Sequence, residues 1–187
     1  MAEDTRERIL SACERVIARS GLRGFRMQEV AREAGVSIGL LAYHFGDRDG
    51  LLEAALDHVN ESAAIRAEAP GEQPAPARLI ALLTSEFGDD EGIRDGSVAW
   101  NELRASAVFD AGQARAVARS TADWQQRVVE LVRESLGPQG ADPEPIALLL
   151  TALVEGLSGR WLTGQITAAQ AQDAMRDAAA RVGIRAD

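Results

Sequence analysis

The chain has 187 residues, and 46% of them are hydrophobic, which is enough to bury one small unit together with one larger core. It has a single cysteine and two histidines, so no intramolecular disulfide can form, and the residue sets needed for metal or nucleophile chemistry are missing. Composition therefore argues against an enzyme of either kind, and we expect no metal and no cofactor.

The formal net charge of −9 is unevenly distributed along the chain. Residues 1–50 hold eight arginines and eight acidic residues, so residues 51–187 carry the whole excess of negative charge. An acidic body repels nucleic acid over about one Debye length. Only the first segment is therefore suited to approach a nucleic acid.

The sequence contains no pattern typical of a signal peptide or a membrane span. Charged residues recur every few positions in residues 1–20, and the longest apolar run, Ile146–Val154, is far too short to cross a bilayer. Together with the single cysteine, this pattern suits a reducing compartment, so a cytoplasmic protein without a membrane partner is expected.

The first helix is predicted from Asp4 to about Ser20, and it should end before the loop that begins at Gly21. Cys13 lies on its apolar face, where a small buried thiol is a better explanation than a redox sensor. This helix is expected to serve as scaffold.

A helix-turn-helix is predicted next. The second helix should begin at Arg26 or Met27 and stop at Gly35, because a sharp turn needs a residue that can adopt positive φ. Ser37 can then cap a third helix that ends near Phe45. Such a unit commonly places its second helix in the major groove of DNA, although two helices that merely pack together would give the same pattern.

Apolar residues recur at helical spacing through the rest of the chain as well. Helices are expected, in chain order, from Asp47 past Val59, over 79–87, from Val98 to about Phe109, from Val117 to Gly137, from Asp142, which precedes Pro143, and from Thr167, which forms a capping box with Gln170. Prolines and glycines predict irregular segments at 67–77 and 88–96. We therefore expect an all-α protein of about nine helices, with residues 1–50 forming one domain and residues 51–187 the other.

The N-terminal third carries a distinctive set of residues. The set comprises Thr5–Leu10, Ala31, Ala34–Ser37, Tyr43–Phe45, Arg48 and Leu51–Leu52. With this spacing the segment resembles the N-terminal domain of TetR-family transcriptional repressors. Within that family, Ser37–Leu41 and Asp49–Ala54 are most similar to the BetI-type branch, and the region of Trp100, Gly156-Leu157 and Trp161 is similar to the C-terminal domain of that branch. The resemblance implies a DNA-binding homodimer that responds to a small-molecule effector.

The resemblance places the DNA contacts on the second and third helices and at the start of the fourth. The candidate residues are Arg26, Gln28, Ser37, Ile38, Gly39, Leu40, Tyr43, His44 and Arg48. Arg26 stands where the family usually has a threonine that caps the helix; an arginine can reach a phosphate but cannot cap in the same way. Ile38 and Leu40 replace a basic residue and a threonine, and they offer apolar contact, for example to thymine methyl groups.

Some of these positions have alternative explanations. Gly39 lowers helix stability by roughly 1 kcal/mol relative to alanine, so a close approach of the backbone to DNA is expected in return. His44 could equally be a packed core histidine, and Arg48 could pair with Asp47 or Asp49 instead of a phosphate. Ala42 stands where the family frequently has an aromatic residue, which removes one expected backbone contact.

Aromatic residues make up only 4% of the chain, and most of the large ones fall in the C-terminal body. They could line an effector pocket, for which the candidates are Phe87, Trp100, Leu103, Phe109, Trp124 and Glu155, with Glu102 as an alternative polar anchor. Core packing explains any single one of the aromatics better. If the BetI-type resemblance extends to ligand chemistry, aromatic faces would hold a cation.

The segment Ile146–Val154 is apolar on all sides, and a helix of that kind must be covered on both faces. We expect this helix and the alanine-rich helix after Thr167 to pack against their two-fold copies as a four-helix interface. The expected interface residues are Leu149, Ala152, Trp161, Ala174 and Ala178.

The sequence thus predicts a homodimeric repressor that leaves a near-palindromic operator when a small-molecule effector binds. The alternative is a helical ligand-binding or scaffold protein without DNA affinity. The identity of the effector, the operator and the regulated genes cannot be predicted from the sequence.

Overall fold

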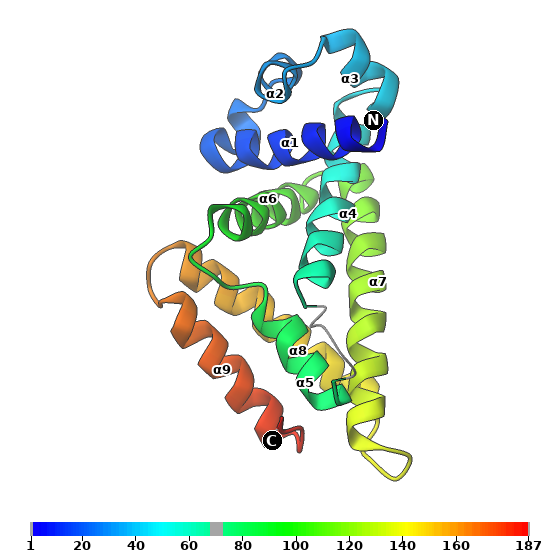
Figure 1. The fold of residues 1–187 in the computed structure, drawn as a ribbon, viewed down its shortest axis with the longest axis vertical. Helices are drawn as coiled ribbons and strands as arrows, with labels where there is room; N and C mark the ends of the chain where they lie inside the picture. The colour runs from blue at the N-terminus through cyan, green and yellow to red at the C-terminus, as the bar shows by residue number, and fades with distance from the viewer. Residues whose placement is uncertain (1, 68–72, 187) are drawn as a thin grey trace. The chain divides into compact units, whose positions relative to one another are not determined.

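The computed structural model describes residues 2–67 and 73–186, and every regular element within these ranges is a helix. The helices are α1 (Ala2–Gly24), α2 (Met27–Ala34), α3 (Ile38–Phe45), α4 (Arg48–Ala67), α5 (Ala75–Thr84), α6 (Glu91–Ala107), α7 (Ala111–Leu136), α8 (Pro143–Leu162) and α9 (Ala168–Arg181) (Figure 1). The prediction of an all-α protein of about nine helices is confirmed.

The chain forms two compact units, and their division differs from a cut at residue 50. Unit 1 takes in the chain up to residue 61 together with residues 90–120, and unit 2 takes in residues 62–89 and 121 onward. Helices α4 and α7 therefore contribute to both units. Unit 1 extends beyond the helix-turn-helix because α1 packs against α6 as well as against α2.

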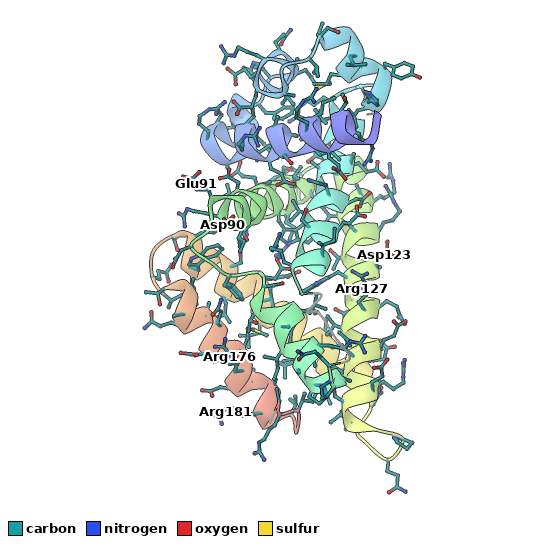
Figure 2. The ribbon with its side chains drawn as sticks, viewed as in Figure 1. Asp90, Glu91, Asp123, Arg127, Arg176 and Arg181 are labelled. Atoms are coloured by element: carbon teal, nitrogen blue, oxygen red, sulfur yellow. The ribbon has the colours of Figure 1, made fainter. Side chains whose placement is uncertain are left out.

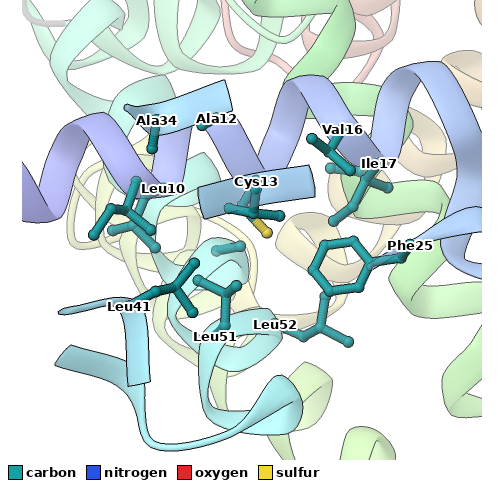
Figure 3. Packing of buried hydrophobic residues seen from close by; sticks show 14 of the residues in the cluster. Leu10, Ala12, Cys13, Val16, Ile17, Phe25, Ala34, Leu41, Leu51 and Leu52 are labelled. Atoms are coloured by element: carbon teal, nitrogen blue, oxygen red, sulfur yellow. The ribbon is translucent and has the colours of Figure 1, made fainter. Parts of the chain in front are cut away.

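Helix α1 is the centre of unit 1, with α2 on one side and α6 on the other (Figure 1). Its fully buried residues are Ile9, Leu10, Ala12, Cys13, Val16 and Ile17, and most of them are seen in Figure 3 among Phe25, Leu41, Leu51 and Leu52. Burial in this cluster raises the pKa of the Cys13 thiol, which confirms the expectation of a buried structural cysteine.

The end of α1 differs from the prediction. The helix breaks at Gly21, as expected, where φ is 62° and ψ is 173°, but residues 22–24 form a further helical turn instead of a loop. The physical reason lies on α6: the Leu22 N–H donates to a carboxylate oxygen of Glu102 at 2.8 Å. Glu102 therefore anchors this turn.

The helix-turn-helix forms as predicted. Helix α2 ends at Gly35, whose φ is 66° and whose N–H donates to the carbonyls of Ala31 and Arg32. The Ser37 hydroxyl oxygen accepts the Leu40 N–H at 3.1 Å and so caps α3. A second cap follows directly, because the Asp47 carboxylate accepts the Gly50 N–H at 3.0 Å at the start of α4.

Two irregular segments were predicted too long. Helix α6 begins at Glu91 and not near Val98, because the Asp90 carboxylate accepts the Gly92 N–H at 2.8 Å and caps the helix (Figure 2). Helix α5 begins at Ala75, since a proline in the first helical turn needs no backbone hydrogen bond. Of the expected linker at 67–77, residues 68–72 lie outside the described residues.

In unit 2, α5, α8 and α9 pack against one another, joined by the part of α7 after residue 120. The caps predicted at Asp142 and Thr167 are both present, the latter as a complete capping box with Gln170. By length and composition alone α8 could cross a membrane, the one such helix in the described chain. One face of it is buried within the unit, where α8 packs against α5 and α9.

Gly50→Ala should destabilise the protein by about 1–3 kcal/mol, because the added Cβ would overlap the carbonyl oxygen of Phe45. Gly39→Ala is the matched control: its added Cβ would meet only the Ser37 hydroxyl oxygen, at 3.9 Å, so it should stabilise α3 by up to about 1 kcal/mol. Urea denaturation of the two variants beside the wild type measures both effects. Equal stability of the two variants would contradict this account.

Candidate nucleic-acid interface

Helix α3 turns an apolar face outward. Leu41 is fully buried and holds the helix on the core of unit 1, while Ile38 is 46% and Tyr43 82% exposed. Leu40, Gly39 and Ala42 are exposed beside them. A helix of eight residues that leaves so much apolar surface uncovered is suited to contact another molecule.

Gly39 has room for a larger residue within the protein. A Cβ built on it would find only the Ser37 hydroxyl oxygen within 4 Å, at 3.9 Å. The fold of the chain therefore does not require glycine at this position. This openness supports the interpretation that an external surface approaches the backbone here.

Three arginines of α1, a helix that precedes the helix-turn-helix, form hydrogen bonds to α2. The Arg8 Nε donates to the Ala34 carbonyl at 3.0 Å, in the last turn of α2. Arg15 and Arg19 both donate to the Glu33 carboxylate, at 3.0 and 3.4 Å. The hydrogen bond from Arg15, together with the charges of both arginines, lowers the pKa of Glu33.

Sequence reasoning treated α1 as scaffold and missed these arginines. Arg8, Arg15 and Arg19 are spaced by seven and four residues, which places them on one face of a helix. The apolar stripe of α1 lies on another face of the helix, so the spacing of the arginines was the only signal available. These side chains fix the orientation of the helix that precedes the turn.

The polar candidates around α3 already have partners within the protein. The Arg48 guanidinium lies 3.4 Å from the Asp49 carboxylate and over the Phe25 ring at 5.6 Å, so the alternative ion pair is present. Arg26 makes no cap and donates instead to the carbonyls of Arg23 and Phe25, at 3.2 and 2.8 Å. Its departure from the family's capping threonine thus has the predicted local effect.

The remaining DNA candidates differ in accessibility. Gln28 is exposed on α2, whereas His44 is only half-buried and meets the Tyr43 ring edge-on at 5.4 Å. His44 is thus neither a fully packed core residue nor a fully presented one.

The predicted effector residues are divided between the two units. Trp100 and Leu103 lie on α6 in unit 1, whereas Phe87, Trp124 and Glu155 belong to unit 2. Phe109 is 92% exposed after the end of α6, so the structure does not enclose it in a pocket. Leu103 alone of this set lines the pocket in unit 1 that the structure shows between α4, α6 and α7.

Trp124 has an unusual environment. Its side chain is 8% exposed, and its indole N–H is buried without a hydrogen-bond partner within the described chain. A buried donor that stays unpaired costs about 1–3 kcal/mol. Such a group is suited to donate to a bound molecule.

The expected interface residues of α8 and α9 fall into two sets. Leu149 is 57% exposed and Ala152 is exposed on the same helix, whereas Ala174 and Ala178 on α9 are half-buried. Trp161 is a correction: it is buried within its own unit, where it packs edge-on against Phe87 with 5.9 Å between ring centroids. It therefore cannot supply an outer surface.

Among the described residues, no group of three or more His, Cys, Asp or Glu side chains is placed to hold a metal ion.

Comparison with known proteins covers both units. Residues 9–55 match the family model described as bacterial regulatory proteins, tetR family, and residues 75–183 match the model described as BetI-type transcriptional repressor, C-terminal. An HTH-type transcriptional regulator BetI from Burkholderia thailandensis is 29% identical over 169 residues, which make up 89% of this chain and 84% of the relative.

Solved structures agree with these matches. The crystal structure of a TetR-family transcriptional regulator from Rhodococcus sp. has a TM-score of 0.89 and 41% sequence identity, covering 98% of this chain and 100% of the other. A transcriptional regulator from Saccharomonospora viridis, solved in complex with choline, shares the fold at a TM-score of 0.78 and 24% identity, covering 95% of this chain and 96% of the other. This chain therefore belongs to the TetR family of DNA-binding transcriptional regulators, in the branch with a BetI-type C-terminal domain.

Proposed function

We propose that the protein is a homodimeric, cytoplasmic repressor in which residues 1–50 bind a near-palindromic operator and residues 51–187 dimerise and receive a small-molecule effector. The exposed apolar face of α3, presented by a capped and clamped helix-turn-helix, carries the proposal. A ligand-binding or scaffold protein without DNA affinity would have no use for that face.

The chemistry of α3 points to a particular kind of base recognition. Its exposed side chains Ile38, Leu40 and Tyr43 include no guanidinium or carboxamide, the groups that read guanine and adenine by paired hydrogen bonds. Apolar side chains in the major groove read the methyl group of thymine. Arg26 and Arg48 lie at the ends of the neighbouring helices and would supply contacts to phosphates, which position the protein without reading sequence.

Arg48→Ala should weaken binding about equally for all DNA sequences and lower the slope of log K against log salt by about one, because one phosphate contact is lost. Ile38→Ala should instead change the preferred site, with a loss of about 1–3 kcal/mol at one base pair. Binding titrations against an operator library at several salt concentrations separate the two effects.

Arg181→Ala is the matched control for Arg48→Ala, since it removes an exposed arginine outside residues 1–50. Replacing the thymines of the operator with deoxyuridine removes their methyl groups. This replacement should weaken operator binding by the wild type more than operator binding by the Ile38→Ala variant. If both arginine variants behave alike and uracil has no effect, the proposed docking is wrong.

An open stripe along α8 supports dimerisation. Leu149, Ala152 and Gly156 are exposed and spaced by three and four residues, so they share one helical face. A Cβ built on Gly156 would meet nothing within 4 Å. A face that combines a large apolar residue with small ones allows a second helix to approach closely.

Leu149→Glu combined with Ala178→Arg should convert dimers to monomers. Each substitution would place a charged side chain in an apolar interface, where dimerisation would bury it. Sedimentation velocity over a range of concentrations measures the change. Val108→Glu, which places a carboxylate at an exposed apolar position of unit 1, is the control and should leave the mass unchanged. A double variant that remains dimeric would place the interface on another surface.

For the effector we propose a small molecule with a hydrogen-bond acceptor, received by the Trp124 indole N–H. Unit 2 also contains the paired rings of Phe87 and Trp161, and burial raises the pKa of the neighbouring Glu86 to about 7 despite the charge of Arg66. Aromatic faces and a buried carboxylate favour a cation. Choline, which the Saccharomonospora viridis regulator binds, has both the cation and the acceptor oxygen.

Helix α4 would carry the signal, since its first residues belong to unit 1 and its last to unit 2. An effector releases the operator only through its different affinities for two arrangements of the dimer. A thousandfold loss of operator affinity requires about 4 kcal/mol of such coupling.

Trp124→Phe should weaken choline binding about tenfold while leaving operator affinity without effector unchanged, because it removes the unpaired N–H and keeps the ring. Isothermal titration calorimetry and operator titration measure the two quantities. Trp100→Phe on α6 is the control and should bind choline as the wild type does. Equal choline affinity in both variants would exclude Trp124 from the effector site.

A further inference from the structure

Helix α3 is held on unit 1 by few side chains. Leu41 is the one residue of the helix that is buried, while Ile38, Leu40 and Tyr43 are exposed. A single buried side chain fixes where a short helix lies, but it resists rotation of the helix about its own axis only weakly. A second contact, away from Leu41, is therefore needed to fix which side chains are presented to DNA.

Phe45 supplies a contact at the other end of the helix. It is the last residue of α3, and its half-buried ring packs against the core of unit 1. Phe45 follows Leu41 by four residues, so both side chains project from the same face of the helix. The helix ends directly afterwards, where the Gly46 N–H donates to the Ala42 carbonyl at 2.8 Å.

Arg6 of α1 covers the Phe45 ring. Its guanidinium carbon lies 5.7 Å from the ring centroid, within the roughly 6 Å over which a cation is attracted to an aromatic face. Arg6 is itself exposed, so burial of its own side chain does not explain this position. The contact joins the early turns of α1 to the last residue of α3 (Figure 1).

The Phe45 ring also neighbours the side chains on the exposed part of α3. The Phe45 and His44 ring centroids are 6.0 Å apart with 45° between the ring planes, and the His44 ring meets the Tyr43 ring edge-on at 5.4 Å. Tyr43 is the most exposed of these three residues. A continuous row of ring contacts therefore leads from the Arg6 guanidinium to a side chain that is available to DNA.

We propose that Arg6 is a positioning residue for operator recognition: through the Phe45 ring it fixes the rotation of α3, and so the direction in which Ile38 and Tyr43 are presented. This inference rests on the DNA contacts of the proposed function. The face of the ring carries negative charge density and attracts the guanidinium, which simple packing of two side chains would not do. A helix that is held in this way loses less freedom when it binds, so base contacts form at lower entropic cost.

A direct phosphate contact is the alternative explanation for an exposed arginine at this place. Loss of a phosphate contact lowers the slope of log K against log salt by about one, whatever the DNA sequence. Loss of a positioning contact leaves the phosphate contacts of other residues in place, so the slope stays nearly the same while operator affinity falls. The two explanations therefore differ in a quantity that titration measures.

Arg6→Gln in the full-length protein should weaken operator binding about two- to fivefold for each α3 helix that meets DNA, with a nearly unchanged salt slope, because an exposed cation–π contact is weak. Arg6→Lys retains the cation and should restore part of the affinity. Arg181→Gln removes an exposed arginine of unit 2 and is the matched control, which should change neither quantity. A slope that falls by about one in Arg6→Gln would overturn the proposal and assign Arg6 to a phosphate.

Fluorinated rings separate the cation–π contact from packing. Replacing Phe45 with mono-, di- and trifluorinated phenylalanine withdraws electrons from the ring face and changes the ring size little. Operator affinity should fall stepwise with fluorination when Arg6 is present, and it should stay constant in the Arg6→Gln background. If fluorination has the same effect in both backgrounds, the ring merely packs and Arg6 does not act through it.

Fluorine NMR tests the contact without DNA. The resonance of 4-fluorophenylalanine at position 45 should shift between the wild type and Arg6→Gln, and an unshifted resonance would overturn the contact. A shifted resonance with unchanged operator affinity would overturn the positioning role. Absence of operator binding by the wild type would overturn the proposed function instead, and the resonance would still decide whether Arg6 lies over the ring.

Discussion

Helix α1 packs against α2 on one side and against α6 on the other, and the orientation of the recognition helix depends on this burial. Each fully buried aliphatic side chain of α1 stabilises the unit by roughly 1.5–3 kcal/mol, whereas an exposed ion pair such as Arg15–Glu33 contributes at most about 1 kcal/mol. Apolar contact therefore holds the helices together. The arginine contacts add direction, because a hydrogen bond such as that from Arg8 to the Ala34 carbonyl is satisfied in only one orientation of α2.

The same two-sided packing explains why α6 belongs with the helix-turn-helix. The α6 face is built from the small buried residues Gly96, Ser97 and Ala99, which allow close approach, and Glu102 then accepts a hydrogen bond where α1 breaks. The pocket beside α4 and α7 lies in this unit too. Elements distant in sequence thus meet the DNA-binding segment directly, and a compact unit of this protein is not a continuous stretch of chain.

Local chemistry made much of the fold predictable. The caps at Ser37, Asp142 and Thr167 and the turn at Gly35 depend on residues within four positions of each other, so the sequence alone contains the whole interaction. The start of α6 was missed because its glycines disfavour a helix, and the Asp90 cap together with burial against α1 offsets that cost. Long-range contacts could not be predicted from the sequence. Glu102 accepts a hydrogen bond from a residue 80 positions away, and the Trp161 ring packs against the Phe87 ring, which lies in another part of the chain.

The burial of Cys13 has a practical consequence for following the protein in solution. It is the only cysteine, it lies at the centre of the unit 1 core, and a thiol so placed reacts slowly with labelling reagents. A cysteine introduced at Ala42, on the outer face of α3, would be the one readily labelled thiol of each subunit. Spin labels attached there would report the distance between the two α3 helices of a dimer. The distribution of that distance could be measured directly in the free, DNA-bound and ligand-bound states.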